Sequence, residues 1–327
     1  MPEPPLPTIE PLAPRVGFYV GSIVGGMRDG ALRWADLAAM AHRAEEIGFD
    51  SFWLPDHLLF RFPDEPAHAP WECWSLLSAL AATTNRLGIG SLVVCTGYRN
   101  PALLAKMADT VDEISGGRFT LGLGAGWHEP EFRAFGYPVD RPIDRFEEAV
   151  DLIRTLLREG RADHHGRYYD VREAELRPRG PHPQGPPLLI GALAGKPRML
   201  RLAATYADVW NGWLVHGRSY ADRVPPLRAA VDAACVAIGR DPATLQRTIG
   251  IAVDQRPGAA QPPARAHAGL APDSSPPVRQ PLTGAPEEIA AELRRFAAQG
   301  VALVQVAPVI DGVAGVEAMA PVLDLLR

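Results

Sequence analysis

The residues best suited to acid–base chemistry directly follow a short apolar segment. Trp53, Leu54 and Pro55 precede Asp56 and His57 in the chain. An imidazole titrates near neutral pH, so a histidine placed after such a segment is a candidate general acid or base. A structural histidine, hydrogen-bonded where a strand ends, is the alternative interpretation. The pattern leaves both open, and we take His57 and Asp56 as the candidate catalytic residues.

A second segment has the composition of an anion-binding turn. The sequence Gly-Ala-Leu-Ala-Gly at 191–195 lies between an apolar segment and a helix-like one. The free N–H groups of such a turn and the dipole of the following helix attract a phosphate. Barrels also use small residues at this point only to pack closely. Lys196 either supports a bound anion or is simply solvated.

Glycines recur at alternate positions in the segment Leu121-Gly-Leu-Gly-Ala-Gly-Trp127. Glycine has no side chain, so a flat ligand has room to lie against the end of this segment. The polar and aromatic residues that follow, beginning with Trp127, are placed to form the rim of a pocket. The combination points to an enzyme that uses a planar cofactor.

Tryptophans near other segment ends divide into two groups. Trp53 and Trp210 lie within apolar segments, where packing is the expected role. Trp213 lies past Asn211 at the end of its segment, where a side chain can form a pocket wall. We therefore assign Asn211 and Trp213 to the substrate pocket.

Strand-like and helix-like segments alternate along the chain, as in an α/β protein. The expected strands are Val16–Gly21, Ser51–Pro55, Leu87–Val94, Phe119–Leu123, Leu188–Leu193, Val209–Trp213, Thr248–Val253 and Val301–Val309. The expected helices are Trp34–Ile47, Trp74–Thr84, one between Asn100 and Gly116, Ile143–Arg158, Pro197–Ala207, Tyr220–Ile238, Glu287–Gln299 and Val316–Leu326.

Eight strand–helix units in one chain predict a (β/α)8 TIM barrel, whose active site lies at the carboxyl ends of the strands. A doubly wound sheet with a second domain would require a linker near the middle, and none is evident. We expect a disordered tail over 1–14 and a single domain over 15–327. An excursion with a small hairpin, Ala162–Pro178, follows the fourth helix. A flexible Pro/Ala-rich insertion, 255–284, follows the seventh strand.

Composition excludes several classes of function. The net charge of −5 gives no basic field for nucleic acid or an anionic membrane. No apolar run approaches the roughly 20 residues of a membrane helix, and the proline-rich start lacks the regions of a signal peptide. The three cysteines form no CxxC pair, which favours a reducing cytoplasm. No histidines and carboxylates have metal-ligand spacing, since the adjacent His164 and His165 point apart, so we expect no metal site.

The chain resembles the bacterial luciferase-like monooxygenase superfamily, in particular its branch of coenzyme F420-dependent oxidoreductases. The resemblance covers 15–327 apart from the insertion. Its most specific segments are 53–57, 72–93, 99–136, 186–213 and 284–293.

The resemblance implies a flavin or deazaflavin across the barrel mouth. It implies that the cofactor phosphate binds at Gly191, Ala192, Leu193 and Ala194. It also implies a non-prolyl cis peptide in the third strand, at Ser91–Leu92, so that Ser91, Leu92 and Val93 support the ring. Ala125, Gly126 and Trp127 would border the ring, and His57 would supply a proton as hydride moves.

Three functions follow as hypotheses. The first is hydride transfer between F420 and a small, apolar or aromatic substrate. The second is an FMN-dependent monooxygenase, which would borrow reduced flavin from a reductase partner. The third is a flavin-binding protein without turnover. Sugar-phosphate dehydrogenases of the F420 branch carry Glu and Lys where this chain has Trp127 and, approximately, His216, so a sugar phosphate is disfavoured. The resemblance to this family also implies a homodimer.

Overall fold

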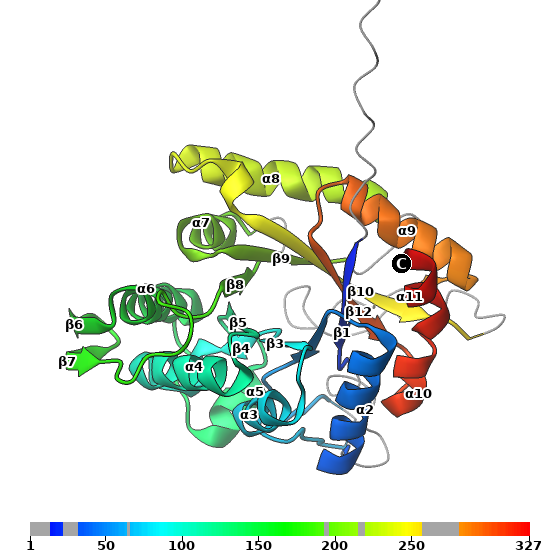
Figure 1. The fold of residues 1–327 in the computed structure, drawn as a ribbon. Coiled ribbons are helices and arrows are strands. Elements are labelled where there is room, and N and C mark those ends of the chain that lie inside the picture. The colour runs from blue at the N-terminus through cyan, green and yellow to red at the C-terminus, as the bar shows by residue number, and fades with distance from the viewer. Residues whose placement is uncertain (1–13, 22–31, 64–65, 193–195, 215–219, 257–280) are drawn as a thin grey trace, which may run out of the picture.

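The computed structural model describes residues 14–21, 32–63, 66–192, 196–214, 220–256 and 281–327. Its parallel strands close into a ring in the order β1-β2-β3-β5-β8-β9-β10-β12, and β12 pairs back onto β1 (Figure 1). The expected (β/α)8 barrel is confirmed. The strands are β1 Arg15–Tyr19, β2 Ser51–Leu54, β3 Gly88–Ser91, β5 Phe119–Gly124, β8 Leu188–Gly191, β9 Val209–Trp213, β10 Gln246–Asp254 and β12 Leu303–Pro308.

Helices surround the ring, as Figure 1 shows. They are α2 Trp34–Ile47, α3 Cys73–Thr83, α4 Pro101–Ser115, α5 Glu129–Phe135, α6 Pro142–Glu159, α7 Pro197–Tyr206, α8 Val224–Ala237, α9 Pro286–Ala298, α10 Gly312–Glu317 and α11 Ala320–Leu326, with short 3-10 turns η1 Thr96–Tyr98, η2 Ala221–Arg223 and η3 Pro242–Thr244. The single last helix expected over Val316–Leu326 is wrong, because the chain forms α10 and α11 instead. No helix within the described ranges is long and apolar enough to cross a bilayer.

Local chemistry explains why α4 begins and ends where it does. The side chain of Asn100 accepts hydrogen bonds from the N–H groups of Ala102 and Leu103, which caps the helix. Gly116 then closes the helix in the left-handed region, at φ 66°. The buried stripe includes Leu104 and Val111, whereas Leu103 lies outside it and is exposed.

The excursion after α6 is the expected hairpin, formed by β6 Arg161–His165 and β7 Asp170–Glu175. It lies beside α6, away from the barrel centre (Figure 1). His164 contacts Glu148 and His165 contacts Asp170, so the two imidazoles have different partners. Most of the insertion, 257–280, and most of the tail lie outside the described residues. Leu282–Thr283 form a short strand, β11, parallel to the end of β10.

The third strand is interrupted at the barrel mouth. β3 ends at Ser91, and β4 Val94–Cys95 resumes the pairing with β5. The non-prolyl cis peptide joins Leu92 and Val93, so the expectation of Ser91–Leu92 is wrong by one residue. The N–H of Leu92 donates to the carbonyl of Leu54 at 2.8 Å, which keeps the Ser91–Leu92 peptide in the ladder with β2. The irregular geometry therefore begins only after that bond.

The alternate glycines of β5 serve this interruption. A Cβ at Gly122 would collide with the carbonyl oxygen of Ser91, and one at Gly124 would lie 2.5 Å from a methyl group of Val93. The hydroxyl of Ser91 also exchanges two 2.9 Å hydrogen bonds with the backbone of Gly122. The space that these glycines leave is filled by the Ser91–Val93 segment. The expectation that they clear room directly for a ligand is therefore wrong.

We predict that Gly122→Ala destabilises the barrel by about 2 kcal/mol, as overpacking against backbone does. Gly191→Ala is the matched control. Among the described residues its Cβ would meet only methyl groups of Val93, at 3.5 and 3.9 Å, and we expect a loss of less than about 0.5 kcal/mol. Urea unfolding followed by circular dichroism measures both. Equal stability of the two variants would contradict the packing role of Gly122.

Candidate active site

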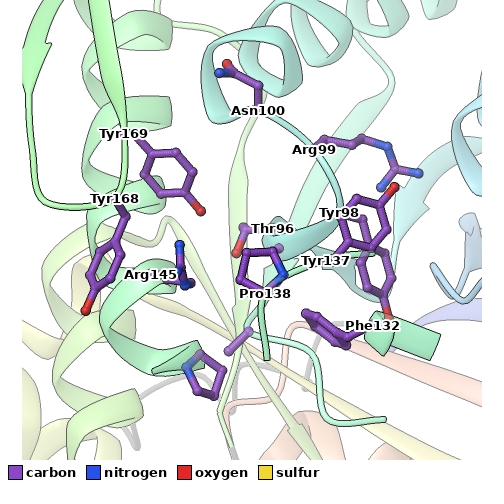
Figure 2. A pocket seen from close by; sticks show the side chains of 13 residues that line it. Thr96, Tyr98, Arg99, Asn100, Phe132, Tyr137, Pro138, Arg145, Tyr168 and Tyr169 are labelled. Carbon is purple, nitrogen blue, oxygen red and sulfur yellow. The ribbon is translucent and has the colours of Figure 1, made fainter. Parts of the chain in front are cut away.

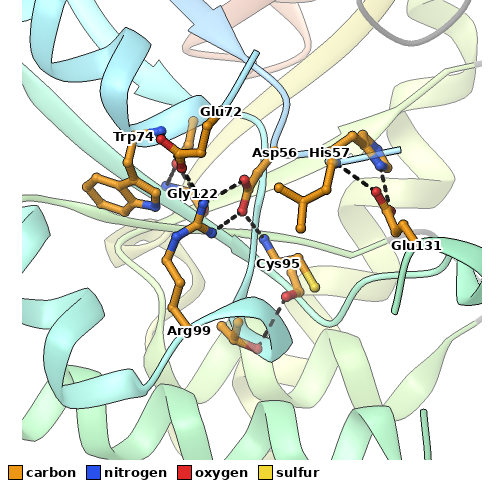
Figure 3. A network of polar contacts seen from close by, with 12 residues as sticks. Asp56, His57, Glu72, Trp74, Cys95, Arg99, Gly122 and Glu131 are labelled. Atoms are coloured by element: carbon orange, nitrogen blue, oxygen red, sulfur yellow. Dashed lines mark hydrogen bonds and ion pairs between the residues drawn. The ribbon is translucent and has the colours of Figure 1, made fainter. Parts of the chain in front are cut away.

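A buried carboxylate fixes the imidazole at the barrel mouth. His57 lies three residues past β2, and Glu131 lies in the first turn of α5. The imidazole Nδ1 is 2.9 Å from Glu131 Oε1, and Glu131 is fully buried while the side chain of His57 is 13% exposed. The N–H groups of Leu58 and Leu59 donate to Glu131 Oε2 at 2.8 and 3.2 Å. Figure 3 shows His57 and Glu131 facing one another.

The charge state of Glu131 determines the histidine tautomer. Burial alone would raise the pKa of Glu131, but hydrogen bonds from His57, Tyr98 and the Leu58 N–H lower it below its usual value. Glu131 is therefore an ionised acceptor, and the proton between the two side chains belongs to Nδ1 of His57. Nε2 of His57 is then the ring nitrogen that can exchange a proton with a ligand.

Asp56 belongs to a different network. Its carboxylate accepts from Arg99 at 2.6 and 3.1 Å and from the N–H of Cys95 at 3.1 Å. Arg99 also donates to Glu72 at 2.6 Å. Burial would lower the pKa of Arg99, but the carboxylates of Asp56 and Glu72 raise it, so the guanidinium stays charged.

The two neighbouring candidates are thus not a catalytic pair. In Figure 3, Asp56 points towards Arg99 and His57 towards Glu131. Asp56 holds the loop after β2 against η1 and α3, which is a positioning role rather than the acid–base role that we had assigned to it.

Aromatic side chains form a wall beside the imidazole. Trp127 is 43% exposed, and its ring lies edge-on to His57 at 5.7 Å between centroids. Phe62 stacks on Trp127 at 6.5 Å, and the fully buried Phe60 lies 4.4 Å from His57. His128 completes the wall. Burial lowers its pKa, and its Nε2 accepts the N–H of Arg61 at 3.0 Å, so the ring is neutral.

The other ring-binding candidates meet at the ends of β3, β5 and β8. The partly buried Val93 side chain lies close to Gly191, whose missing Cβ leaves room beside its methyl groups. Ala125 is half-exposed at the end of β5. Gly126 differs, because a Cβ there would strike Cys95 and Phe132. Small residues, an apolar bulge and an imidazole at the edge fit a planar heteroaromatic ring.

The anion-binding turn is only partly described, because Leu193 and Ala194 lie outside the described residues. Gly191 ends β8, and α7 begins at Pro197 without a side-chain cap for its first turn. The N–H of Ala192 donates to the carbonyl of Asn211 at 3.0 Å, and its own carbonyl accepts from Trp210 Nε1 at 3.0 Å. Ala192 therefore anchors the turn, and its amide is not available for a phosphate. A phosphate at this turn would need donors other than the Ala192 N–H.

The two residues assigned to the substrate pocket lie deeper than expected. Asn211 is 5% exposed, and its amide donates to Thr248 at 3.0 Å and to Gln305 at 3.1 Å inside the barrel. The ring of Trp213 packs edge-on to Tyr19 at 5.2 Å and occupies the space left by Gly250. Both belong to the packed interior beneath the mouth, although Trp213 keeps some exposure. Trp53 and Trp210 are buried, as expected.

Sequence reasoning missed Glu131. Two acidic residues, Glu129 and Glu131, lie in the first turn of α5, and both have the type favoured at a helix start. Only the fold separates them, since Glu129 is exposed beside Arg133 whereas Glu131 faces His57 from 74 residues away. No cluster of potential metal ligands exists within the described ranges.

Comparisons with known proteins identify the family and related folds. A family model described as luciferase-like monooxygenase matches residues 15–302. A phthiodiolone/phenolphthiodiolone dimycocerosates ketoreductase from Mycobacterium sp. (strain JLS) is 34% identical over 63% of this chain and 56% of its own length. An F420-dependent glucose-6-phosphate dehydrogenase from Amycolatopsis mediterranei is 34% identical over 53% of this chain and 51% of its own. An F420-dependent hydroxymycolic acid dehydrogenase from Mycobacterium tuberculosis is 34% identical over 74% and 63%.

The matched region spans about half to two thirds of the length of these curated relatives. Among solved structures, an F420-dependent secondary alcohol dehydrogenase in complex with an F420–acetone adduct superposes with a TM-score of 0.75 at 20% identity. The match covers 97% of this chain and all of that one. Monooxygenase RslO1 from Streptomyces bottropensis gives 0.71 at 22% identity, over 95% and 97% of the two chains. At these identities the likeness concerns the fold alone. The matching family model covers most of the chain, and the protein therefore belongs to the luciferase-like monooxygenase family.

Proposed function

We propose that this protein is an F420-dependent oxidoreductase that transfers a hydride between the deazaflavin and a small apolar or aromatic substrate. The observation that carries the proposal is the His57–Glu131 pair, which engages Nδ1 of the imidazole and leaves Nε2 as the nitrogen that can exchange a proton. The curated relatives named above add support, since two of them are F420-dependent dehydrogenases and one is a ketoreductase.

The residues present divide the work of such a reaction. F420, when bound, supplies or accepts the hydride. His57 Nε2 exchanges the accompanying proton with the substrate oxygen or nitrogen. Glu131 holds the imidazole by its other nitrogen and stabilises it when it is charged. Val93 and Ala125 would support the ring, and the backbone amides near the start of α7 would bind the phosphate.

The aromatic wall favours a particular substrate class. Hydride and proton together reduce a carbonyl, an imine or a polarised double bond, and the reverse reaction oxidises an alcohol or amine. Trp127 and Phe62 offer apolar contacts beside the imidazole, and the buried Phe60 packs behind them. A sugar phosphate gains nothing from this wall. His216, which stands approximately where F420-dependent sugar-phosphate dehydrogenases carry a Lys, lies outside the described residues.

An FMN-dependent monooxygenase is the competing function, because the same family carries it and the same ring and phosphate positions suit both cofactors. It would require a flavin reductase as partner. A flavin carrier without turnover is the third function. The homodimer and the cytoplasmic location expected from the sequence stay predictions.

The cofactor choice is tested by anaerobic titration with reduced and oxidised F420 and FMN, followed by fluorescence. We expect F420 to bind in the micromolar range or tighter and at least about tenfold more tightly than FMN, a difference of roughly 1.4 kcal/mol. Tight FMN binding without F420 binding would establish the alternative.

The Glu131→Gln variant tests the acid–base assignment. Its amide can donate to Nδ1, which moves the imidazole proton to Nε2 and leaves the wrong nitrogen protonated. We expect kcat for F420-dependent turnover to fall about 100-fold, while the F420 dissociation constant changes less than about twofold. Glu129→Gln, two residues away on the same helix and exposed, is the matched control and should retain activity.

Nitrogen-15 NMR of the histidine ring distinguishes positioning from folding effects. We expect the Nδ1–H tautomer for His57 in the wild type and the Nε2–H tautomer in Glu131→Gln. An Nε2–H tautomer in the wild type, or full activity of Glu131→Gln, would refute the role of Glu131. His57→Ala that binds F420 but lacks turnover would exclude the carrier function.

A further inference from the structure

A second concave site lies beside the barrel mouth. Its volume is about 290 Å³, and it lies between η1, the loop joining α5 to α6, and the hairpin β6–β7 (Figure 2). Thr96 and Ala125, which follow β4 and β5, are among its lining residues. Ala125 is also expected to border the cofactor ring. The cavity is therefore within reach of a ligand that is seated across the mouth.

The cavity lining carries two guanidinium groups, those of Arg99 and Arg145, and no carboxylate of its own among the described residues. Arg99 is neutralised by Asp56 and Glu72. Arg145 pairs with Asp140, whose two carboxylate oxygens lie 3.0 and 3.3 Å from Arg145 Nη2. Asp140 is 61% exposed, so water weakens this pair.

Arg145 is also held in a defined position. Its guanidinium carbon lies 4.5 Å from the centre of the Tyr168 ring, and its Nε donates to the carbonyl of Asp140 at 3.0 Å. The side chain of Arg145 is only 22% exposed. A pre-positioned, largely desolvated guanidinium binds an anion more strongly than a mobile surface one does.

A neutral donor faces the same space. Figure 2 shows the hydroxyl of Tyr169 and the guanidinium of Arg145 directed towards the interior of the cavity. Burial raises the pKa of Tyr169, so its hydroxyl stays protonated and can donate. Glu148, a carboxylate of α6 beside the hairpin, accepts hydrogen bonds from the N–H groups of Tyr168 and Tyr169, at 3.0 and 2.8 Å.

Side-chain contacts also connect the cavity lining to the first turn of α7. Arg198, in the first turn of α7, pairs with Asp144 in the first turn of α6 at 2.5 Å. The hydroxyl of Tyr168 reaches the other oxygen of Asp144 at 3.5 Å. Asp144 also pairs with Arg141, so the negative charge between the two sites is compensated. The start of α7 and the cavity lining are therefore linked through Asp144 and Tyr168.

We propose that this cavity is a carboxylate subsite, in which Arg145 and the Tyr169 hydroxyl bind an acidic group of a ligand seated at the mouth. The carboxylate has two sources, the glutamyl tail of F420 or an acid group on the organic substrate. The first source rests on the proposed function, and the second does not depend on the cofactor.

The test compares Arg145→Gln with Arg172→Gln. Arg172 lies on β7 of the hairpin that also carries Tyr169. It is 74% exposed and does not line the cavity, so Arg172→Gln controls for the change in net charge. Three probes are titrated calorimetrically: F420 with its glutamyl tail, F420 from which the glutamates have been removed, and benzoate. Tyr169→Phe is a second variant that removes only the hydroxyl and keeps the ring packed.

If the tail is the occupant, Arg145→Gln weakens binding of tailed F420 about tenfold or more, as loss of a charge-assisted hydrogen bond does. Tail-free F420 changes less than twofold, and Tyr169→Phe weakens the tailed form about threefold. If the substrate is the source, both forms of F420 bind unchanged and benzoate binding is lost in Arg145→Gln. Either result supports the subsite.

The proposal is overturned if Arg145→Gln binds all three probes as Arg172→Gln does, or if Arg145→Gln does not fold and Tyr169→Phe alters none of them. Failure of the proposed function has a different signature. In that case neither form of F420 binds the wild type, while benzoate still reports on the cavity.

Discussion

The mouth of this barrel depends on one buried carboxylate. Glu131 is fully enclosed, and an ionised carboxylate in that position is very costly unless donors surround it. The imidazole of His57, the N–H groups of Leu58 and Leu59, and the Tyr98 hydroxyl supply those donors. The loop after β2, the turn η1 and the start of α5 are therefore fixed relative to one another. His57 is held in its orientation because its imidazole is one of the donors that stabilise the buried negative charge of Glu131.

A second ionic network makes that arrangement possible. Asp56 and His57 are neighbours in the chain, but their side chains turn to opposite sides. Asp56 and Arg99 form a two-point ion pair that Glu72 extends to the start of α3, where Glu72 also accepts from the N–H groups of Trp74 and Ser75. Asp56 anchors the loop through Arg99, and His57 places its imidazole at the barrel mouth. Breaking a buried pair of this kind leaves an uncompensated charge, so the anchor is as necessary to the site as the imidazole.

The sequence predicts the barrel well, because each element carries its own local signals. The helix over Trp34–Ile47 ends at Gly48, whose φ of 92° only glycine adopts readily, and both ends are predicted correctly. The site is predicted less well, because it consists of contacts between distant segments. A carboxylate next to a histidine in sequence suggests a pair, whereas the actual partner comes from another loop. The glycines of β5 suggest a ligand surface, but what lies against them is the irregular Ser91–Val93 segment. The local sequence does not show whether a histidine pairs with its neighbour or with a distant carboxylate. It also does not show whether a glycine faces a ligand or another backbone segment.

The two sides of the mouth differ in chemistry, and this difference restricts how a ligand can lie. On one side Trp127, Phe62 and Phe60 form an apolar wall next to His57. On the other side lie Arg145 near the start of α6, paired with Asp140, and Arg198 at the start of α7, paired with Asp144. A ligand with an acidic end and an apolar reacting end has one favourable orientation across such a mouth, since the reversed one would place a charge against aromatic rings. The same asymmetry allows the acidic end to vary in length without moving the reacting atoms. Binding at the arginines can then be strengthened or weakened independently of the geometry at His57 Nε2, because the two contacts lie on separate elements of a rigid barrel.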